Sequence, residues 1–234
     1  RTIGSGAAPL GEELEQACAA RLGCEIYQGF GLTEVAGASH VNSALTGVIK
    51  PGSVGPVIPN TESKIIDIET GAELGANEKG EILVRGPHVM VGYLNNPKAT
   101  ANAMDSEGWF RTGDVGYVDE EGIFYIVDRV KELIKYKAYQ VAPAELEALL
   151  LSHTSIADAA VIPSPNEEAG EVPKAFVVLK EALTPQEIMD WVAEQVAPYK
   201  RIRLLDIVDE IPKSASGKIL RRVLVERERA RLAG

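Results

Sequence analysis

Hydrophobic and polar residues follow two different patterns along the chain, and the change falls near Asp128. Before that residue, short apolar runs at 64–68, 81–84 and 123–127 are separated by residues that favour turns. Residues 119–122 fit the loop of a β-hairpin. Runs of this length and spacing predict a small antiparallel β unit or a barrel.

The residues before these strands carry a helical pattern. Apolar spacing predicts a helix over residues 11–22, which ends on Gly23 in a left-handed conformation. The side chains expected on its buried face are Leu14, Ala17, Cys18 and Leu22. A short strand over residues 24–27 and a turn over residues 29–31 should follow. Residues 44–62 are rich in Gly, Pro, Ser and Thr and predict loops with short strands.

After Asp128 the pattern predicts a mixture of helices and strands. The expected elements are a helix beginning at Pro143, strands at 159–162, 174–179 and 202–208, a helix opened by the capping box Thr184–Glu187, and a helix over 219–232. Their core-facing residues should be Leu146, Leu149 and Leu150, then Ile188, Val192 and Val196, and last Leu220, Val223 and Leu224. We therefore place a domain boundary near 128–131, which gives domains of residues 1–128 and 129–234.

Composition narrows the class of protein. The 234 residues are 45% hydrophobic and carry a formal net charge of −10, which argues against nucleic acid or an anionic membrane as a general partner. Cys18 and Cys24 are the only cysteines, so a reduced, cytoplasmic protein is expected rather than a disulfide framework. The chain starts inside a glycine-rich turn, and we expect it to be part of a longer protein.

A glycine-rich segment near residue 30 has the residues for a phosphate and metal site. Gly29 allows close approach of a ligand, and Thr33 offers a hydroxyl to a phosphate oxygen. The carboxylate of Glu34 suits Mg2+, which bridges phosphates while keeping waters, and Phe30 can stack on a purine. The alternative interpretation is an ordinary junction between a strand and a helix.

A Thr-Gly-Asp turn leads into the predicted hairpin. Asp114 can accept hydrogen bonds from both ribose hydroxyls, and Arg129 can hold ribose and phosphate with its planar guanidinium. Taken alone, Asp114 is more often an ordinary aspartate in a turn, and Arg129 is more often a solvated arginine at the end of a hairpin. Their order around one hairpin favours a nucleotide site.

Two basic segments follow. The first contains Lys131, Lys135, Lys137 and Gln140, and it is either a site for phosphates or a solvated charged face. The second ends at Lys218, which can offset negative charge that develops at an α-phosphate, or can simply begin a helix. Its spacing differs from that of a Walker loop.

Together, these segments resemble the adenylate-forming enzymes, a superfamily of acyl-CoA synthetases, luciferases and adenylation domains. Residues 5–10 (SGAAPL) and 134–147 look most like the 4-coumarate–CoA ligase and luciferase branch. The resemblance implies a fold of both α/β and α+β character. It comprises the C-terminal part of a large N-terminal domain, with a sheet segment and a small β-barrel, joined by a hinge to a small α+β C-terminal domain.

The resemblance also implies a role for each matching residue. Thr33 and Glu34 correspond to phosphate and Mg2+ contacts, Asp114 and Arg129 to ribose and phosphate contacts, Lys131 to the hinge, and Lys135, Gln140 and Lys218 to contacts with an acyl-adenylate. Lys137 and Ala138 correspond to CoA contacts, and Ala7, Gln28 and Gly29 lie near the acyl group. The family has Gly where this chain has Ala138, so we expect a narrower CoA channel, loss of positive φ there, and slower thioester formation.

The activity that this resemblance implies is ATP-dependent ligation of a carboxylic acid to CoA, with ATP/AMP, Mg2+ and CoA as cofactors and a 4-coumarate- or cinnamate-type acid as substrate. The Ser/Thr/Gly-rich loop that grips the β- and γ-phosphates in this family precedes the SGAAPL segment and is not in the chain. The chain alone is therefore expected to be inactive and to need the preceding portion of the enzyme. The alternatives are an enzyme that loads a carrier protein, a luciferase-like enzyme, and a module that binds AMP or CoA without turnover.

Overall fold

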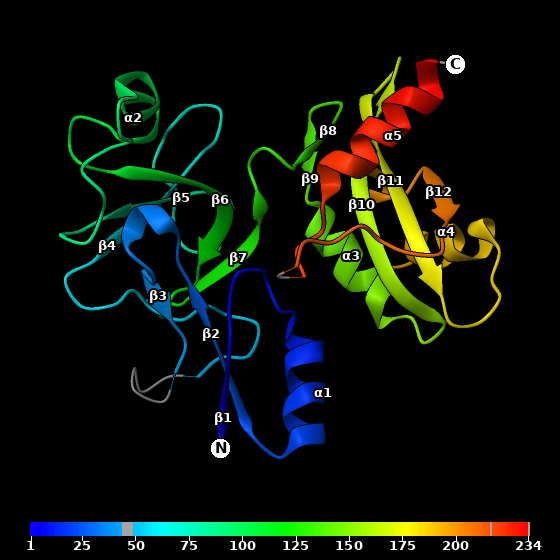
Figure 1. Ribbon diagram of the computed structural model, residues 1–234, viewed down its shortest axis with the longest axis horizontal. Coiled ribbons are helices and arrows are strands. Elements are labelled where there is room, and N and C mark those ends of the chain that lie inside the picture. The colour runs from blue at the N-terminus through cyan, green and yellow to red at the C-terminus, as the bar shows by residue number, and fades with distance from the viewer. Residues whose placement is uncertain (44–48, 216, 234) are drawn as a thin grey trace. The chain divides into compact units, whose positions relative to one another are not determined.

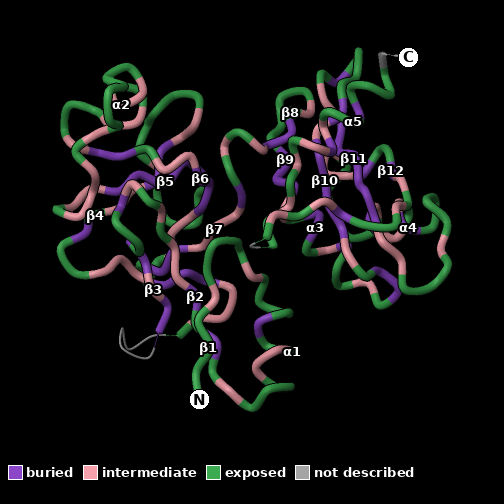
Figure 2. Tube along the Cα trace, viewed as in Figure 1, coloured by how far each residue is buried: buried purple, intermediate pink, exposed green. Residues whose placement is uncertain are grey.

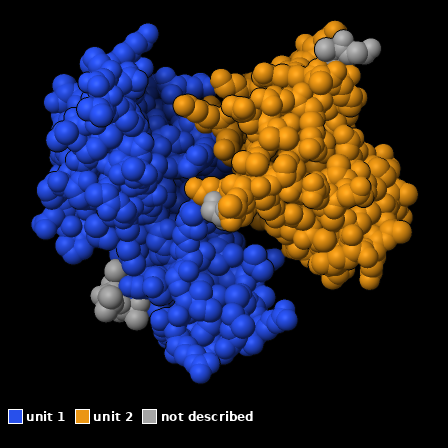
Figure 3. Space-filling model, in the orientation of Figure 1, with its two compact units in different colours: residues 1–130 blue, residues 131–234 orange. Residues whose placement is uncertain are grey.

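The computed structural model describes residues 1–43, 49–215 and 217–233 (Figure 1). It separates into two compact units, Arg1–Val130 and Lys131–Gly234 (Figure 3). Part of the loop region predicted at 44–62, residues 44–48, lies outside the described residues, as does Ser216 in the second basic segment.

The first unit begins with a three-stranded sheet of order β1-β2-β3. Its elements are β1 (Thr2–Ser5), α1 (Glu12–Leu22), β2 (Glu25–Phe30) and β3 (His40–Val41). Strands β1 and β2 are parallel, and α1 connects them, because parallel neighbours need a crossover connection. Gly23 ends α1 with φ 59°, as predicted. The turn predicted at 29–31 is wrong at its start, because β2 continues through Phe30.

The buried face predicted for α1 is wrong. Leu14 and Leu22 are 58% and 55% exposed, whereas Glu15 is 3% exposed. The Glu15 carboxylate accepts hydrogen bonds from the Gln28 side chain at 2.7 Å and from the Gly52 amide at 2.8 Å. These polar contacts, made by residues distant in sequence, select the face of α1 that packs inward.

A four-stranded antiparallel sheet completes the first unit. It runs in the order β4 (Glu62–Ile66), β5 (Gly80–Arg85), β6 (Phe110–Val118) and β7 (Phe124–Arg129), with α2 (Pro97–Ala103) between β5 and β6. Its core includes Ile82, Phe110 and Phe124, joined by Val35 from a short 3-10 helix, Thr33–Val35. Along the described residues the sheet is open, with β4 and β7 at its two edges, so the predicted barrel is not formed.

The second unit has a five-stranded sheet with helices on both faces (Figures 1 and 2). Its elements are β8 (Ile134–Tyr136), β9 (Tyr139–Val141), α3 (Pro143–Ser152), β10 (Ile156–Asn166), β11 (Gly170–Leu179), α4 (Pro185–Ala193), a 3-10 helix (Pro198–Lys200), β12 (Leu204–Ile207) and α5 (Arg221–Ala233). Successive side chains of β10 point to opposite faces of the sheet, so Val161 packs against α3 and α4 and the next residue, Ile162, packs against α5. Burial on both faces explains why these strands are nearly continuous apolar runs.

Predictions for the helices of this unit hold in part. The capping box is confirmed, since Thr184 N–H donates to Glu187 at 2.8 Å and Glu187 N–H donates back to the Thr184 hydroxyl at 3.3 Å. Val196 lies beyond the end of α4 and only borders the core. Leu220 precedes α5 and is 40% exposed, so Leu224, at 1% exposed, is the main residue by which α5 docks.

Candidate functional site

Asp114 and Arg129 lie directly opposite each other on β6 and β7. Arg129 Nε is 3.2 Å from Asp114 Oδ1, and the Asp114 side chain is 7% exposed while that of Arg129 is 58% exposed. The register of the two strands shifts between Val115 and Gly116, as at a β-bulge, and such irregularities re-aim neighbouring side chains. The structure thus brings together the carboxylate and the guanidinium that the sequence predicts for a nucleotide, and the guanidinium faces solvent.

The predicted Thr-Gly-Asp turn is wrong, because Thr112, Gly113 and Asp114 lie within β6, where its register with β5 shifts. This irregular stretch of β6 is held by Glu81, a residue that sequence reasoning missed. Gly113 takes φ 71° and donates its amide to Glu81 Oε1 at 3.2 Å, while Arg111 donates to Glu81 Oε2 at 2.8 Å. The Thr112 hydroxyl accepts the Asp114 amide at 3.0 Å and donates to the Ile82 carbonyl at 2.8 Å. This stretch of β6 is therefore held by hydrogen bonds within the protein itself, without a ligand.

The Thr33–Glu34 segment needs glycine at Gly31. A Cβ on that residue would lie 1.6 Å from the Gly37 carbonyl oxygen, so any larger residue would collide with backbone. Thr33 is exposed, and Glu34 is half-buried. Tyr93 donates its hydroxyl to Glu34 Oε1 at 2.8 Å, a contact that sequence reasoning also missed.

Phe30 and His40 line the inner side of this segment. The Phe30 ring packs against the core and lies 5.6 Å from the His40 ring. His40 is fully buried, and burial lowers its pKa to about 3, so the imidazole is neutral at physiological pH. Ser39 Oγ lies 2.9 Å from His40 Nδ1.

Residues predicted near the acyl group come together at the ends of β1 and β2. Gln28 is 3% exposed, and its side chain exchanges hydrogen bonds with both backbone groups of Leu10, at 3.1 Å to N and 2.8 Å to O. The segment that contains Ala7, which has φ 72°, is thereby fixed beside β2. A Cβ built on Gly6 would lie 3.7 Å from the Gly29 carbonyl oxygen, which shows how closely the two backbones approach.

In the second unit, β8 and β9 form a hairpin in which Lys135 pairs with Gln140. Lys137 and Ala138 form its two-residue turn, and both are exposed. The positive φ of 53° belongs to Lys137, and Ala138 is not among the residues with positive φ. Ala138 therefore takes no positive φ, as expected, and the left-handed residue of this turn is Lys137. Lys131 is exposed and begins the unit.

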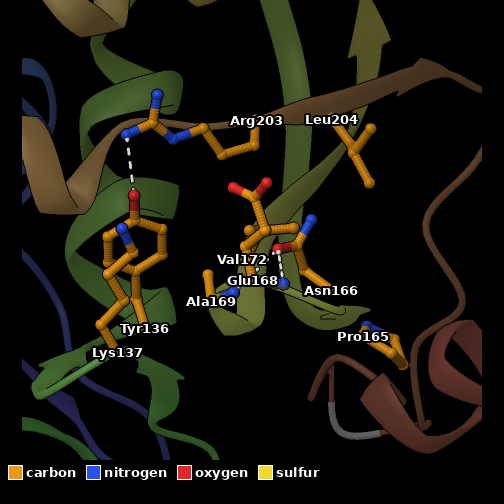
Figure 4. A pocket seen from close by; sticks show the side chains of 9 residues that line it. All are labelled: Tyr136, Lys137, Pro165, Asn166, Glu168, Ala169, Val172, Arg203 and Leu204. Carbon is orange, nitrogen blue, oxygen red and sulfur yellow. Dashed lines mark hydrogen bonds between the residues drawn. The ribbon is translucent and has the colours of Figure 1, made fainter.

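A cavity of about 320 Å³ lies beside this hairpin (Figure 4). Its lining is Tyr136, Lys137, Pro165, Asn166, Glu168, Ala169, Val172, Arg203 and Leu204. The Arg203 guanidinium lies over the Tyr136 ring at 5.5 Å and contacts the Tyr136 hydroxyl at 3.5 Å. Lys137 donates its amide to the Ala169 carbonyl at 2.8 Å, which ties the hairpin turn to the cavity wall.

Lys218 lies in a compact, exposed turn. The Ser214 amide donates to the Lys218 carbonyl at 2.8 Å, and the Lys218 amide donates to the Ser214 hydroxyl at 3.1 Å. Close to this turn, Arg221 forms ion pairs with Glu132 at 2.8 Å and Glu147 at 2.6 Å. The start of α5 is thus attached to α3 and to the residue after Lys131, a connection that sequence reasoning did not find.

Comparison with known proteins supports a site for an adenine nucleotide. The model of the AMP-binding enzyme family matches residues 1–94, and the model of the AMP-binding enzyme C-terminal domain matches residues 145–218. The chain belongs to the AMP-binding enzyme family. It is 54% identical to a 4-coumarate–CoA ligase of Pinus taeda and 52% identical to 4-coumarate–CoA ligase 2 of Nicotiana tabacum. Both alignments cover 100% of this chain and 43% of the relative.

Solved structures of other family members share the fold. The ATP-bound MatB from Rhodopseudomonas palustris is 31% identical, with a TM-score of 0.91 over 97% of this chain and 45% of that chain. The anthranilate CoA ligase AuaEII in complex with anthranoyl-AMP is 31% identical, with a TM-score of 0.88 over 100% of this chain and 46% of that chain. The chain therefore spans slightly less than half the length of the family members that it matches.

Glu34 is the one site residue that the sequence predicts for Mg2+. Within residues 1–43, 49–215 and 217–233, no three acidic, His or Cys side chains gather into a metal-binding group. A single carboxylate fits Mg2+ nonetheless, because this ion is commonly held by one or two carboxylates together with substrate phosphates and waters. No helix in the described part of the chain is long and apolar enough to cross a membrane.

Proposed function

We propose that this chain is the adenylate- and CoA-handling part of an ATP-dependent carboxylic acid–CoA ligase that acts on 4-coumarate or cinnamate-type acids. The observation that carries the proposal is the identity of 50–54% to 4-coumarate–CoA ligases over the entire chain. Since the chain spans 43% of those relatives, we propose that catalysis requires the preceding portion of the enzyme. We further propose that the enzyme works in the cytoplasm.

The first unit has the residues to hold the nucleotide. Asp114 is buried and fixed, so its carboxylate can bind the ribose hydroxyls without reorganisation. Arg129 extends into solvent from the opposite strand, where its guanidinium can reach ribose and phosphate. Thr33 offers a hydroxyl to a phosphate oxygen, and Glu34 would hold Mg2+. That ion would neutralise phosphate charge as pyrophosphate leaves.

The second unit has two exposed basic segments that we propose act in succession. Lys218 stabilises charge at the α-phosphate while the carboxylate attacks, with Lys135 and Gln140 as further contacts to the acyl-adenylate. Rotation of the second unit about Lys131 then replaces the Lys218 segment at the nucleotide by the segment that contains Lys135 and Gln140. The CoA thiol attacks the acyl-adenylate, and AMP leaves. In both steps a lysine supplies positive charge where negative charge develops.

The cavity beside the β8–β9 hairpin supports CoA as the acceptor. Lys137 and Arg203 line it, and cationic side chains of this kind bind phosphate groups. Ala138 is the neighbour of Lys137 in the same turn, and we propose that the thiol arm passes beside it. A carrier-protein acceptor would not require this cavity.

The test uses the longer enzyme that contains this chain, with 4-coumarate, cinnamate, malonate and anthranilate offered in parallel. We expect pyrophosphate release and CoA thioester formation with the first two acids, and AMP binding without turnover for residues 1–234 alone. Transfer of the acyl group to a carrier protein but not to CoA would refute the ligase proposal. Oxygen-dependent light emission would favour a luciferase.

A further inference from the structure

The loop between β5 and α2 holds a tyrosine against the acidic residue of the candidate site. The Tyr93 hydroxyl donates to Glu34 Oε1 at 2.8 Å, across 59 residues of sequence. The carboxylate can only accept, so the phenol is the donor.

The loop is built to keep Tyr93 in place. The backbone amide of Tyr93 donates to the Thr100 hydroxyl at 2.9 Å, and that hydroxyl donates to the Asn96 carbonyl at 3.1 Å. Asn96 caps α2 by accepting the Ala99 amide at 3.0 Å. Gly92 has φ 150°, and a Cβ on it would lie 2.8 Å from Thr100 Cγ2, so the approach of the loop to α2 requires glycine.

Residue 34 is anchored at a second point. The Met90 amide donates to the Glu34 carbonyl at 2.7 Å, so one loop fixes both the backbone and the side chain of this residue. A glutamate side chain otherwise has several rotamers, and ordering it on ligand binding opposes affinity. The phenol uses one acceptor position, and a carboxylate has about four, so positions remain for a metal ion or its waters.

We infer that Tyr93 is a positioning residue that orients the Glu34 carboxylate for Mg2+ bound with ATP. This inference rests on the proposed role of Glu34. It assigns a function to a loop whose exposed side chains, including Val91 and Leu94, otherwise offer no chemistry. Tyr93 acts through Glu34 and has no contact with the reacting atoms in this account.

The test compares Tyr93→Phe with Tyr125→Phe in the longer enzyme. The control also removes a phenol near a carboxylate in the same unit, since Tyr125 Oη lies 3.4 Å from Asp119 Oδ2. Calorimetry gives the ratio of ATP affinities measured with and without Mg2+, which is a binding readout and does not depend on turnover. We expect Tyr93→Phe to reduce that ratio by about tenfold, as loss of one hydrogen bond to a charged group would, and Tyr125→Phe to leave it unchanged.

Thiolation of preformed acyl-AMP provides a second readout. This half-reaction releases no pyrophosphate, so Tyr93→Phe should leave its rate at the wild-type value, whereas a general loss of structure would slow it. Thr100→Val loosens the same loop without altering the phenol, and it should reduce the Mg2+-dependent ratio by a smaller factor.

Glu34→Gln separates failure of the inference from failure of the proposed role of Glu34. If Glu34→Gln leaves the Mg2+-dependent ratio unchanged, Glu34 holds no metal, and both statements are wrong. If Glu34→Gln lowers the Mg2+-dependent ratio while Tyr93→Phe and Tyr125→Phe give the same ratio, only the inference about Tyr93 is overturned.

Discussion

Replacement of Glu228 by Gln should weaken the second unit in a manner that depends on pH. Glu228 lies on α5 and is 2% exposed, and it accepts hydrogen bonds from Lys174 at 2.6 Å and from Ser164 at 2.9 Å. Lys174 is 1% exposed on β11 and also pairs with Asp206 at 2.7 Å. Arg231 contacts both oxygens of Glu228, at 2.9 and 2.8 Å. The cluster attaches α5 to the sheet by charge as well as by Leu224.

The structure sets the magnitude of the effect. Hydrogen bonds from Arg231 first, and then from Lys174 and Ser164, hold the pKa of Glu228 at about 2, below its ordinary value of 4.5. At about 1.36 kcal/mol per pKa unit, this corresponds to roughly 3 kcal/mol of stability. The Arg231 side chain is 55% exposed, so solvent screening reduces the expected loss to roughly 2 kcal/mol.

The sign of the pH dependence follows from the lowered pKa. The folded state binds the Glu228 proton more weakly than the unfolded state, so the stabilisation is complete above about pH 4.5 and declines as pH falls toward 2. The difference in free energy of unfolding between wild type and Glu228→Gln should therefore be roughly 2 kcal/mol at pH 7 and should shrink between pH 5 and pH 3.

Urea unfolding of the 234-residue protein, labelled with 5-fluorotryptophan, measures this difference. The protein has two tryptophans, one in each unit, so the fluorine resonance of Trp191 reports on the second unit separately from Trp109. Glu226→Gln is the control, because the Glu226 side chain is 61% exposed and pairs along α5 with Arg222 at 3.1 Å. The loss of stability in this variant should stay below about 0.5 kcal/mol. The reasoning would be refuted if Glu228→Gln lowered the free energy of unfolding no more than Glu226→Gln does, or if its loss were constant from pH 7 to pH 3.

Two further predictions concern the site. Asp114→Asn should weaken AMP binding by about tenfold or more, because a charge-assisted acceptor is lost from a preformed position on β6; calorimetry with AMP checks this, and unchanged affinity would remove Asp114 from the nucleotide site. Ala138→Gly should accelerate thiolation of preformed acyl-AMP without changing pyrophosphate exchange, because removal of the Cβ widens the path of the thiol arm. Single-turnover kinetics of each half-reaction measure this difference, and an equal change in the rates of thiolation and pyrophosphate exchange would contradict the prediction.

The strands of this protein were accessible to sequence reasoning because their apolar runs are set by burial on the sheet faces. The strand predicted at 81–84 is one residue short at each end, and the strand predicted at 174–179 begins four residues late and ends at the observed residue. The face of α1 was not accessible, because Glu15 is buried by partners at Gln28 and Gly52 that local periodicity cannot show. Whether the β4–β7 sheet closes depends likewise on pairing between distant strands.

The candidate site also has features that the sequence could predict and features that it could not. Asp114 and Arg129 could be paired from the sequence because a predicted hairpin connects them. The bulge beside them leaves no pattern in the sequence. The bracing of β6 by Glu81 and the contact between Tyr93 and Glu34 join residues 30 or more positions apart, which local periodicity cannot show. The position of the strained residue in the basic hairpin was also hidden, since the register of β8 and β9 puts the positive φ on Lys137.

The most direct test of the central claim, that two basic segments of one unit serve successive steps, is the effect of Lys218→Ala on the two half-reactions of the longer enzyme. Lys218 is exposed on a turn distinct from the β8–β9 hairpin. The account predicts that ATP–pyrophosphate exchange falls by on the order of 10²–10³, while thiolation of preformed acyl-AMP proceeds at the wild-type rate. An equal loss in both half-reactions would contradict it.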